Sequence, residues 1–576
     1  MKINMKLNRI FYSIAALSFL ATTACSDSYL DEKIYSLYTP ETVDDVNGSL
    51  LGLHKRVGNI LGISGQQGYW GIWQDGTDVG APGDIQGVER PFYQYGELDS
   101  ENAGVSFLWE KLYQIVSGAN VIIANSSSAT PAQIAEARFF RAWAYDQLVT
   151  GWGDVPLLTE PVTTPRTDFT RTPKAEVDKV IDEDLQFAME NLPEVNALVK
   201  EARISKDAAR ILAGQAYNRM GYQYGDSQYY SKAEQACTAV INSGNYKLIS
   251  ERYGKFTLEA GDFYADMFRY GNQRRSQGNT EVIWNFEQEN NASVPNGTID
   301  NAQHRRNWVP AFHKLSGMQN ADSIGGRGNG RLRLSNYVKY CIYSKDDIRN
   351  SNFNIRRVMW YNRPGWEGAT YYLDKNGYRV PNDNADDPDV VSTVQASYGS
   401  RVYCHAGDTL NVFYPHTTKW GAYDPNDDFG YAMVKDFPMM RFAEAYLLRA
   451  EARVRQNNMT GAVEDINVLR DRAFKLARLA ENNPTLGAVS ASEMNIDFIL
   501  DERIRELVGE ENRRFTLMRT GELTNRVNMM KHPSLIETEP TKQISGYNPE
   551  KHVLLPIPLA NIQLNKDAEL TQNPGY

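Results

Sequence analysis

The stretch TPAQIAEARFFRAWAYDQLVTGWGDVP, residues 130–156, decides which fold we expect for this chain. Within it Ala135, Phe139, Ala142 and Trp143 recur at spacings of three and four residues, which is the pattern of a half-buried helix. The Thr-Pro pair before them signals the start of a helix, and the glycines and proline after them end it. We therefore predict a helix over residues 132–150 whose apolar face packs on other helices.

The same spacing recurs on both sides of this stretch. It predicts helices over residues 107–125, 174–191, 205–221 and 229–243, and again over 440–456, 459–477 and 492–520. Helices joined in pairs by short turns are typical of an α-solenoid of the tetratricopeptide type, although no strict 34-residue repeat is visible. We therefore predict a mainly α fold built on a tetratricopeptide-like scaffold of helical repeats.

The composition changes between residues 256 and 436, where glycine, asparagine, aspartate and aromatic residues dominate and the helical spacing of apolar residues is weak. Residues 281–286 alternate like a short strand. A connection of this length is improbable as plain loop, so we predict an irregular, loop-rich lobe with short strands. The expected units are a signal peptide (1–24), a tether (25–40), an N-terminal helical part (41–255), the lobe (256–436), and C-terminal helices with a docking tail (437–576).

The N-terminus has the composition of a targeting signal. Lys2, Lys6 and Arg9 precede an apolar stretch over residues 10–21 that is too short to span a bilayer. Small residues then lead to Cys25, as in a bacterial lipobox, although Thr22 stands where leucine is usual. We expect cleavage before Cys25 and lipidation of its thiol, with an ordinary signal peptide as the alternative.

Charge and cysteine content narrow the functional classes. The chain has 61 Lys and Arg against 71 Asp and Glu, a net charge of −10, which argues against non-specific binding of nucleic acid. Cys237, Cys341 and Cys404 form no C-x-x-C motif, so no zinc or redox site is indicated. Either Cys341 pairs with Cys404, or all three are buried free thiols.

Several short motifs follow one another in a fixed order. They are AEARFFRA (135–142), GDVPL (153–157), RFAEAYLLRAEA (441–452), NVLRDRA (467–473), ERIREL (502–507), LPIP (555–558) and QNPGY (572–576). Together with the lipobox, the set closely resembles the SusD/RagB family, whose members are surface lipoproteins that bind nutrients at the outer membrane. The resemblance implies a SusD-like fold, a lipid anchor facing the cell surface, and a SusC-like TonB-dependent transporter as partner.

The motifs indicate a structural role and not a catalytic one, because their charged residues lie on helices beside large apolar residues. We expect buried or half-buried ion bridges between stacked helices from Glu136, Arg138, Arg141, Glu444, Arg449 and Glu451. The final QNPGY should fold back and dock on the helices.

No enzyme motif stands out. The seven histidines have no metal-binding spacing, and neither a G-x-S-x-G elbow nor a Walker loop is present. Residues 424–428 look calcium-like, but Gly430 falls one place late and Lys435 replaces the final glutamate. We therefore predict no catalytic residue, no metal and no cofactor, although a glycosidase carboxylate pair cannot be judged from counting.

Aromatic residues, 11% of the chain, point to a sugar-binding protein, because sugar rings stack on flat aromatic faces while polar side chains take their hydroxyls. Two segments combine both kinds of residue. The first supplies Trp70, Trp73, Asp75, Asp78, Asp84, Arg90 and Tyr93 as candidates, with Trp70 or Trp73 as core residues in the alternative reading.

The second segment lies in the irregular lobe and supplies Trp308, Trp360, Trp366 and Tyr371. Trp366 is the leading candidate, because Gly365 and Gly368 flank it as at an exposed loop tip. In the alternative reading these aromatics form the core of the lobe, which we favour for Trp308 and Trp360, or face the transporter.

We therefore expect a surface lipoprotein of the outer membrane that binds oligo- or polysaccharide and delivers it to a SusC-like TonB-dependent transporter. An oligopeptide receptor of the same transport system is the alternative. A hydrolase and a scaffold without a ligand of its own are less favoured.

Overall fold

The structure is a computed structural model that describes residues 45–61, 69–125, 127–198, 200, 202–288, 304–320, 325–405, 413–421 and 435–576. The expected signal peptide (1–24), the lipidation site Cys25, the tether (25–40) and the calcium-like turn (424–428) lie outside these residues.

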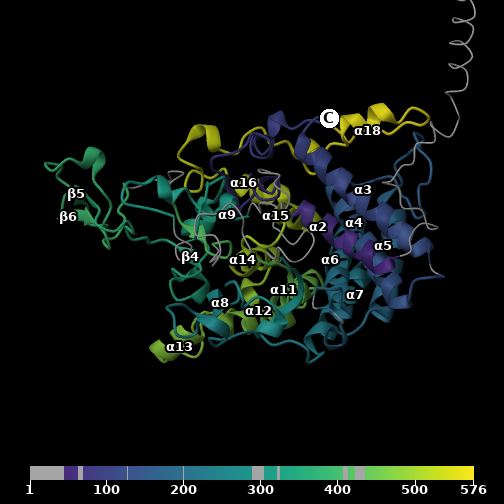
Figure 1. Ribbon diagram of the computed structural model, residues 1–576, viewed down its shortest axis with the longest axis horizontal. Helices are drawn as coiled ribbons and strands as arrows, with labels where there is room; N and C mark the ends of the chain where they lie inside the picture. Colours follow the sequence, from purple (N-terminus) through teal and green to yellow (C-terminus); the bar gives the residue numbers. More distant parts are fainter. Residues whose placement is uncertain are drawn as a thin grey trace, which may run out of the picture.

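The N-terminal helices pack side by side in a row (Figure 1). They are α2 (Val46–Ile60), α3 (Ala103–Ala124), α4 (Pro131–Trp152), α5 (Lys174–Asn191), α6 (Lys206–Tyr224) and α7 (Ser227–Ile241). Helix α11 (Phe442–Arg455) packs on α7, and α12 (Met459–Ala473) packs on α11. The chain therefore leaves the row after α7, builds the lobe, and returns to continue the same row.

Local signals in the sequence set the ends of these helices. Thr130 and Gln133 form a reciprocal capping box at the start of α4, and Gly153 ends that helix with a φ of 74°, a conformation that glycine adopts without strain. Ser205 caps α6, and Gly225 ends it in the left-handed region. The predicted helices are thereby confirmed, and α5 has the predicted bounds.

The C-terminal part differs from the prediction at two places. It contains α13 (Lys475–Glu481), α14 (Ile496–Leu507), α15 (Arg513–Thr520), α16 (Leu523–Met529), α17 (Pro549–His552) and α18 (Leu559–Leu564). The helix predicted over 459–477 is divided at Phe474 into α12 and α13. The single helix predicted over 492–520 is wrong, because the chain turns at Gly509, where φ is 79°. Asn512 then caps α15 by accepting a hydrogen bond from the Phe515 amide. The turn carries Glu510 and Glu511, which pair with buried arginines described below.

The C-terminal tail docks as predicted. Its Asn573 side chain donates hydrogen bonds to the carbonyl oxygens of Leu555 (2.7 Å) and Trp152 (3.1 Å) and accepts one from Arg171 (2.6 Å). The Tyr576 hydroxyl donates to the Leu554 carbonyl at 3.0 Å. The tail is therefore tied to the end of α4.

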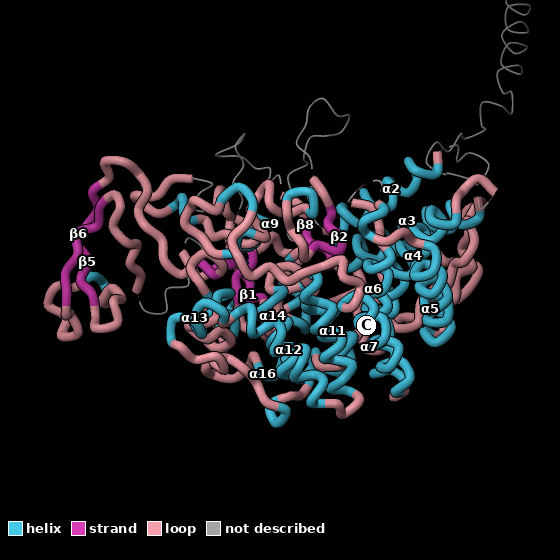
Figure 2. Tube along the Cα trace, turned by 90° about the horizontal axis from the view of Figure 1, so that it is seen from below, coloured by secondary structure: helices cyan, strands magenta, loops and turns pink. Residues whose placement is uncertain are grey.

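The remaining elements form the lobe, which contains four two-stranded antiparallel sheets in the described residues. The pairs are β1 (Gly80–Pro82) with β3 (Leu332–Leu334), β2 (Val282–Phe286) with β8 (Phe437–Arg441), β4 (Ile355–Arg356) with β7 (His416–Thr417), and β5 (Glu367–Leu373) with β6 (Ser392–Ser397). Short helices α8 (Phe263–Asp266), α9 (His304–Trp308) and α10 (Asn336–Tyr340) lie between them. Figures 1 and 2 place the β5–β6 hairpin at the end of the molecule opposite α5. The predicted fold class, a helical scaffold with an irregular lobe, is confirmed.

Residues 69–102 differ from the helical texture expected of the N-terminal part. They hold strand β1 and three short 3₁₀ turns, the first over Gly71–Trp73. Strand β1 pairs with β3 of the lobe, and a Cβ on Gly83 would lie 1.8 Å from the Gly330 carbonyl oxygen. This close backbone approach keeps the segment extended, so it packs with the lobe.

The predicted ion bridges between helices are confirmed. The pairs are Glu136 with Arg203 (2.5 Å) and His54 (2.8 Å), Arg141 with Asp184 (2.7 Å), Arg138 with Asp184 (3.4 Å), Glu444 with Arg503 (3.2 Å), Arg449 with Asp465 (2.6 Å), and Glu451 with Arg519 (2.7 Å). All of these side chains are buried or half-buried.

The cysteines correct one expectation. Cys237 is buried, Cys341 is exposed and Cys404 is partly exposed, and none of the three forms a disulfide with another described cysteine. The pairing of Cys341 with Cys404 is therefore wrong. The alternative, burial of all three thiols, holds for Cys237 alone.

Candidate functional site

The aromatic residues of the first candidate segment lie in the core. Trp70 is fully buried, and Trp73 and Tyr93 are nearly so. The rings of Trp70 and Trp73 are tilted against each other with centroids 4.7 Å apart, and burial raises the pKa of Tyr93 to about 12. These side chains offer no open face for a sugar ring, so we do not keep them as ligand contacts.

Some charged residues of the same segment are buried and others are exposed. Asp78 is buried and accepts two hydrogen bonds from Arg513, at 2.8 and 2.7 Å. Asp75 is fully buried, and burial, followed by the nearby Glu89 carboxylate, raises its pKa well above the usual range. Asp84 and Arg90 are exposed. The structure therefore does not bring the seven candidates together on one surface.

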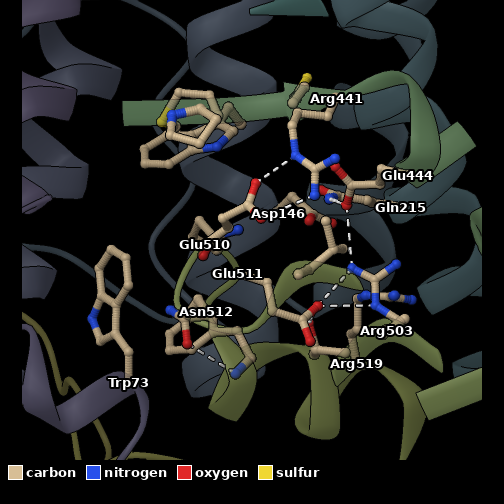
Figure 3. Close-up of a pocket in the computed structure, with 18 of the residues that line it drawn as sticks. Trp73, Asp146, Gln215, Arg441, Glu444, Arg503, Glu510, Glu511, Asn512 and Arg519 are labelled. Carbon is tan, nitrogen blue, oxygen red and sulfur yellow. Dashed lines mark hydrogen bonds and ion pairs between the residues drawn. The ribbon is translucent and has the colours of Figure 1, made fainter. Parts of the chain in front are cut away.

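A small polar cavity of about 110 Å³ lies between α4, β8, α11 and the turn that joins α14 to α15 (Figure 3). Arg441 and Glu510 form one ion pair in its wall, at 2.6 Å, and Arg503 and Glu511 form another, at 2.7 Å. Although burial alone would raise it, Arg503 holds the pKa of Glu511 down at about 2.

The volume of this cavity admits a few water molecules and is far below that of ordinary ligand pockets. Because its charges are paired with one another, the arrangement joins the two halves of the helical row. The cavity is too small for an ordinary substrate, and the carboxylates Glu510 and Glu511 in its wall are ion-paired, although the buried Arg503 Nη1 and Asn512 Nδ2 atoms have no hydrogen-bond partner among the described residues. We interpret it as structural.

In the lobe, Trp308 is fully buried, as expected of a core residue, and so is Trp284. Trp366, our leading candidate, is half-buried. Its ring packs on Tyr361 with centroids 4.3 Å apart, and its indole N–H donates to the Ser316 hydroxyl at 3.1 Å. The loop tip is exposed at residues 363–365 and 367, but the indole is only partly exposed because it packs on the small core of the lobe.

Tyr371 is also partly covered. The Arg379 guanidinium lies 3.9 Å from the centroid of its ring, and Arg379 is itself ion-paired with Asp383. One aromatic face of Tyr371 is thus already occupied by a cation.

Trp360 has the opposite environment. Its side chain is 51% exposed, whereas those of its neighbours Met359 and Tyr361 are buried. The Val402 amide donates to the Met359 carbonyl (2.8 Å), and the Tyr361 amide donates to the Ser400 carbonyl (2.9 Å). Trp360 is thereby set opposite Arg401 in an antiparallel bridge. Our preference for Trp360 as a core residue is therefore wrong.

This bridge brings an aromatic ring and a cation to one surface. Side chains opposite each other in an antiparallel pair share a face, and they lie closest in pairs that exchange no hydrogen bonds, as here. Arg401 is exposed, and its guanidinium lies 5.7 Å from the ring of Tyr403. We define Trp360, Arg401 and Tyr403 as the Trp360 face.

Exposed aromatic residues gather in this part of the lobe. Seven aromatic side chains of the described residues are largely exposed, and five of them fall between residues 340 and 398. Besides Trp360 they are Tyr340, Phe353, Tyr378 and Tyr398. Sequence reasoning missed these four, although Tyr378 and Tyr398 each adjoin a glycine of positive φ, Gly377 and Gly399, which is a readable turn signal.

The described residues offer no arrangement typical of a metal centre or of a membrane span. No group of three or more described His, Cys, Asp or Glu side chains could hold a metal ion. Burial lowers the pKa of His304 and of His416 to about 3. Among the helices of the described ranges, none is long and apolar enough to cross a membrane.

Comparison with known proteins adds evidence independent of the geometry. The sequence profile of the "SusD family" matches residues 280–576, and a second profile, "Starch-binding associating with outer membrane", matches residues 88–217. "SusD-like protein P25" of Formosa agariphila is 25% identical over 575 residues, which cover 96% of this chain and 96% of that protein.

Two solved structures illustrate the likeness of fold. A SusD homologue from Bacteroides thetaiotaomicron has a TM-score of 0.66 at 19% identity, with 95% of this chain and 99% of that chain covered. "Surface glycan-binding protein A" from Bacteroides thetaiotaomicron, in complex with laminarihexaose, has a TM-score of 0.62 at 18% identity, with 92% and 98% covered. At these identities the likeness shows the shared fold alone.

Proposed function

The chain belongs to the SusD family, and on this premise we propose that it captures glycan at the surface of the outer membrane and passes it to a SusC-like TonB-dependent transporter. It does so without chemical change of the glycan. Lipid on Cys25 anchors the chain, and the residues that follow it tether the folded part. Capture needs only modest affinity, because a tethered receptor raises the effective concentration of ligand at its partner.

One observation carries the glycan proposal, namely the exposed Trp360 opposite Arg401. Exposed aromatic rings that lie together mark interaction sites, and Arg401 links Trp360 with the ring of Tyr403 on this face. The indole supplies a flat platform for the C–H face of a sugar, and the guanidinium supplies donors for its hydroxyls. A protein of the same fold is in complex with laminarihexaose, which supports an oligosaccharide as the class of ligand.

The pairing of the buried charged residues supports the proposal of capture without chemistry. The buried carboxylates around the internal cavity are neutralised by arginine, as Glu510 is by Arg441 and Glu511 by Arg503. A glycosidase needs two carboxyl groups facing one open site. The Trp360 face contains no carboxylate among its three residues.

The test is affinity electrophoresis of residues 26–576 in gels that contain one polysaccharide each. Wild type should be retarded by at least one glycan, and Trp360→Ala and Arg401→Ala should lose most of the retardation. Tyr222→Ala is the matched control, because Tyr222 is an exposed aromatic on the helical part, and it should behave as wild type.

Two results would contradict the proposal. Retardation that survives both lobe variants would place the glycan elsewhere. Retardation by no glycan, together with binding of oligopeptides in solution, would favour the peptide receptor.

A further inference from the structure

A second, larger cavity opens in the lobe, and its described lining shares no residue with the Trp360 face. Its volume is about 470 Å³, which lies within the range of ordinary ligand pockets. It is enclosed on one side by residues 256–270, which include α8, and on the other by the paired strands β4 and β7. The short β4–β7 ladder fixes the second wall, because Arg356 is paired with His416.

The walls carry an excess of positive charge. Arg269, Arg356 and Lys435 line the cavity, and Glu259 is the only carboxylate among the described residues that line it. Glu259 is more than half exposed and is ion-paired with Arg269 at the rim. Arg356 and Lys435 therefore lack a carboxylate partner in the lining.

Arg356 is the most unusual of these residues. Its Nη1 atom is buried and has no hydrogen-bond partner, and a Cβ on Gly325, which also lines the cavity, would lie 3.9 Å from that atom. Burial lowers the pKa of Arg356 to about 10. A guanidinium with a buried, unpartnered nitrogen destabilises a fold unless its charge is compensated, and the other described residues that line the cavity form no ion pair with Arg356.

Lys435 adds a second basic group without a carboxylate partner in the described part of the lining. Its ammonium group donates to the Gly421 carbonyl at 3.2 Å, which satisfies a hydrogen bond but not the charge. Burial, together with the charges of Arg269 and Arg305, lowers the pKa of Lys435 to about 7. Arg356 thus acts on the enclosed volume together with Lys435, which is partly protonated near pH 7, and Arg269, whose charge is paired with Glu259.

Aromatic rings also line the cavity, beside small residues and the polar side chains of His416 and Thr418. Phe256, Phe268 and Phe353 contribute rings, and the Arg269 guanidinium lies 3.8 Å from the centroid of Phe256. A ligand that fits must therefore present an apolar ring surface as well as a negative group. Inorganic anions have no such surface, and neutral sugars would leave the cationic groups unpaired.

We propose that this cavity binds an acidic sugar residue, one that carries a carboxylate or a sulfate ester, with its anionic group on Arg356 and Lys435 and its ring against the phenylalanines. The inference rests on the proposed function, because it takes the ligand to be a saccharide. It adds a charge requirement that the Trp360 face does not impose.

The test is isothermal titration of the folded protein with glucuronate, glucose 6-sulfate and glucose. The two acidic sugars should bind and glucose should not, and binding should weaken as salt concentration rises. Arg356→Met should weaken binding of both acidic sugars about tenfold or more, since it removes charge-assisted hydrogen bonds while keeping an unbranched apolar side chain. Lys435→Met should weaken it in the same direction.

Arg166→Met is the control, because it removes one equally charged but exposed side chain outside the lobe. Thermal unfolding gives a second reading. Acidic sugars should raise the melting temperature of wild type and of the control but not of Arg356→Met. Arg356→Met alone should melt no lower than wild type, since it removes an unpaired buried charge.

The assignment is overturned if glucuronate and glucose 6-sulfate fail to bind, if they bind Arg356→Met as well as wild type, or if inorganic sulfate binds as tightly as glucose 6-sulfate. These outcomes are distinct from failure of the proposed function. A protein retarded by neutral polysaccharide that ignores acidic sugars would refute this inference alone.

Discussion

Replacement of Asp78 by asparagine separates a structural role from a ligand-binding one. Asp78 follows two tryptophans in a loop, which made it a candidate for sugar contact, but the structure buries it against Arg513. We predict that Asp78→Asn destabilises the fold strongly and leaves the glycan-binding surface itself unchanged.

The magnitude follows from the contacts. Asp78 accepts two charge-assisted hydrogen bonds from Arg513 at 2.8 and 2.7 Å and lies 3.5 Å from Arg526. Bonds of this kind contribute about 1.5–3 kcal/mol each, or about 3–6 kcal/mol together. Glu511 stays 3.1 Å from Arg513, and Asp501 stays 2.6 Å from Arg526, so both cations keep a partner. We therefore expect a loss near the lower end, about 3 kcal/mol.

The assay is urea unfolding followed by tryptophan fluorescence, for which the buried Trp70 and Trp73 are nearby reporters. Asp84→Asn removes the same charge from an exposed position and should change the unfolding free energy by no more than about 0.5 kcal/mol. An Asp78→Asn protein as stable as wild type that is no longer retarded by glycan would refute the reasoning.

Three further predictions concern stability. Asp75→Asn should raise the unfolding free energy at pH 7 by about 1 kcal/mol or more and change it little at pH 3. Burial raises the pKa of Asp75 in the fold above its unfolded value, so the ionised carboxylate destabilises the fold increasingly as pH rises. Urea titration at both pH values checks this. Arg503 lowers the pKa of Glu511 to about 2 in the fold. The stability that this ionised carboxylate contributes is therefore present above pH 4.5 and should fall as the pH is lowered from about 4.5 toward 2. The free energy of unfolding, measured across that pH range, checks this. Asn573→Ala should cost about 2 kcal/mol, since two backbone carbonyl oxygens lose their donor, and a lowered melting temperature would show it.

Local pattern was sufficient to predict most of the helices, but not the turn at Gly509 that separates α14 from α15. In α4 the apolar spacing, the Thr-Pro pair at the start and Gly153 at the end are all local features. They predict the helix and its ends from the sequence alone. The ion bridges were also predictable in kind, because charged residues on an otherwise buried helix require partners. Which partner each takes, as Glu451 takes Arg519, is decided by packing between helices far apart in sequence.

The candidate site shows where that reasoning ends. Trp70 and Trp360 each stand next to a tyrosine in the sequence, yet one is fully buried and the other is 51% exposed. The difference arises from distant pairing. Residues 359–361 pair with 400–402, which turns Trp360 outward, whereas Asp78 near Trp70 is held by Arg513. Sequence spacing within one segment carries no information about either partner.

The cationic cavity was not predictable for the same reason. Arg356 and Lys435 are far apart in the chain and carry no motif. Only the pairing of β4 with β7 brings Arg356 to the wall that Lys435 shares.

The most direct test of the account is a crystal structure of the protein with a glycan that retards it in gels. The account predicts a sugar ring stacked on the indole of Trp360, with the Arg401 guanidinium at hydrogen-bond distance from its hydroxyls. A glycan bound to the helical part, with Trp360 left in solvent, would contradict it.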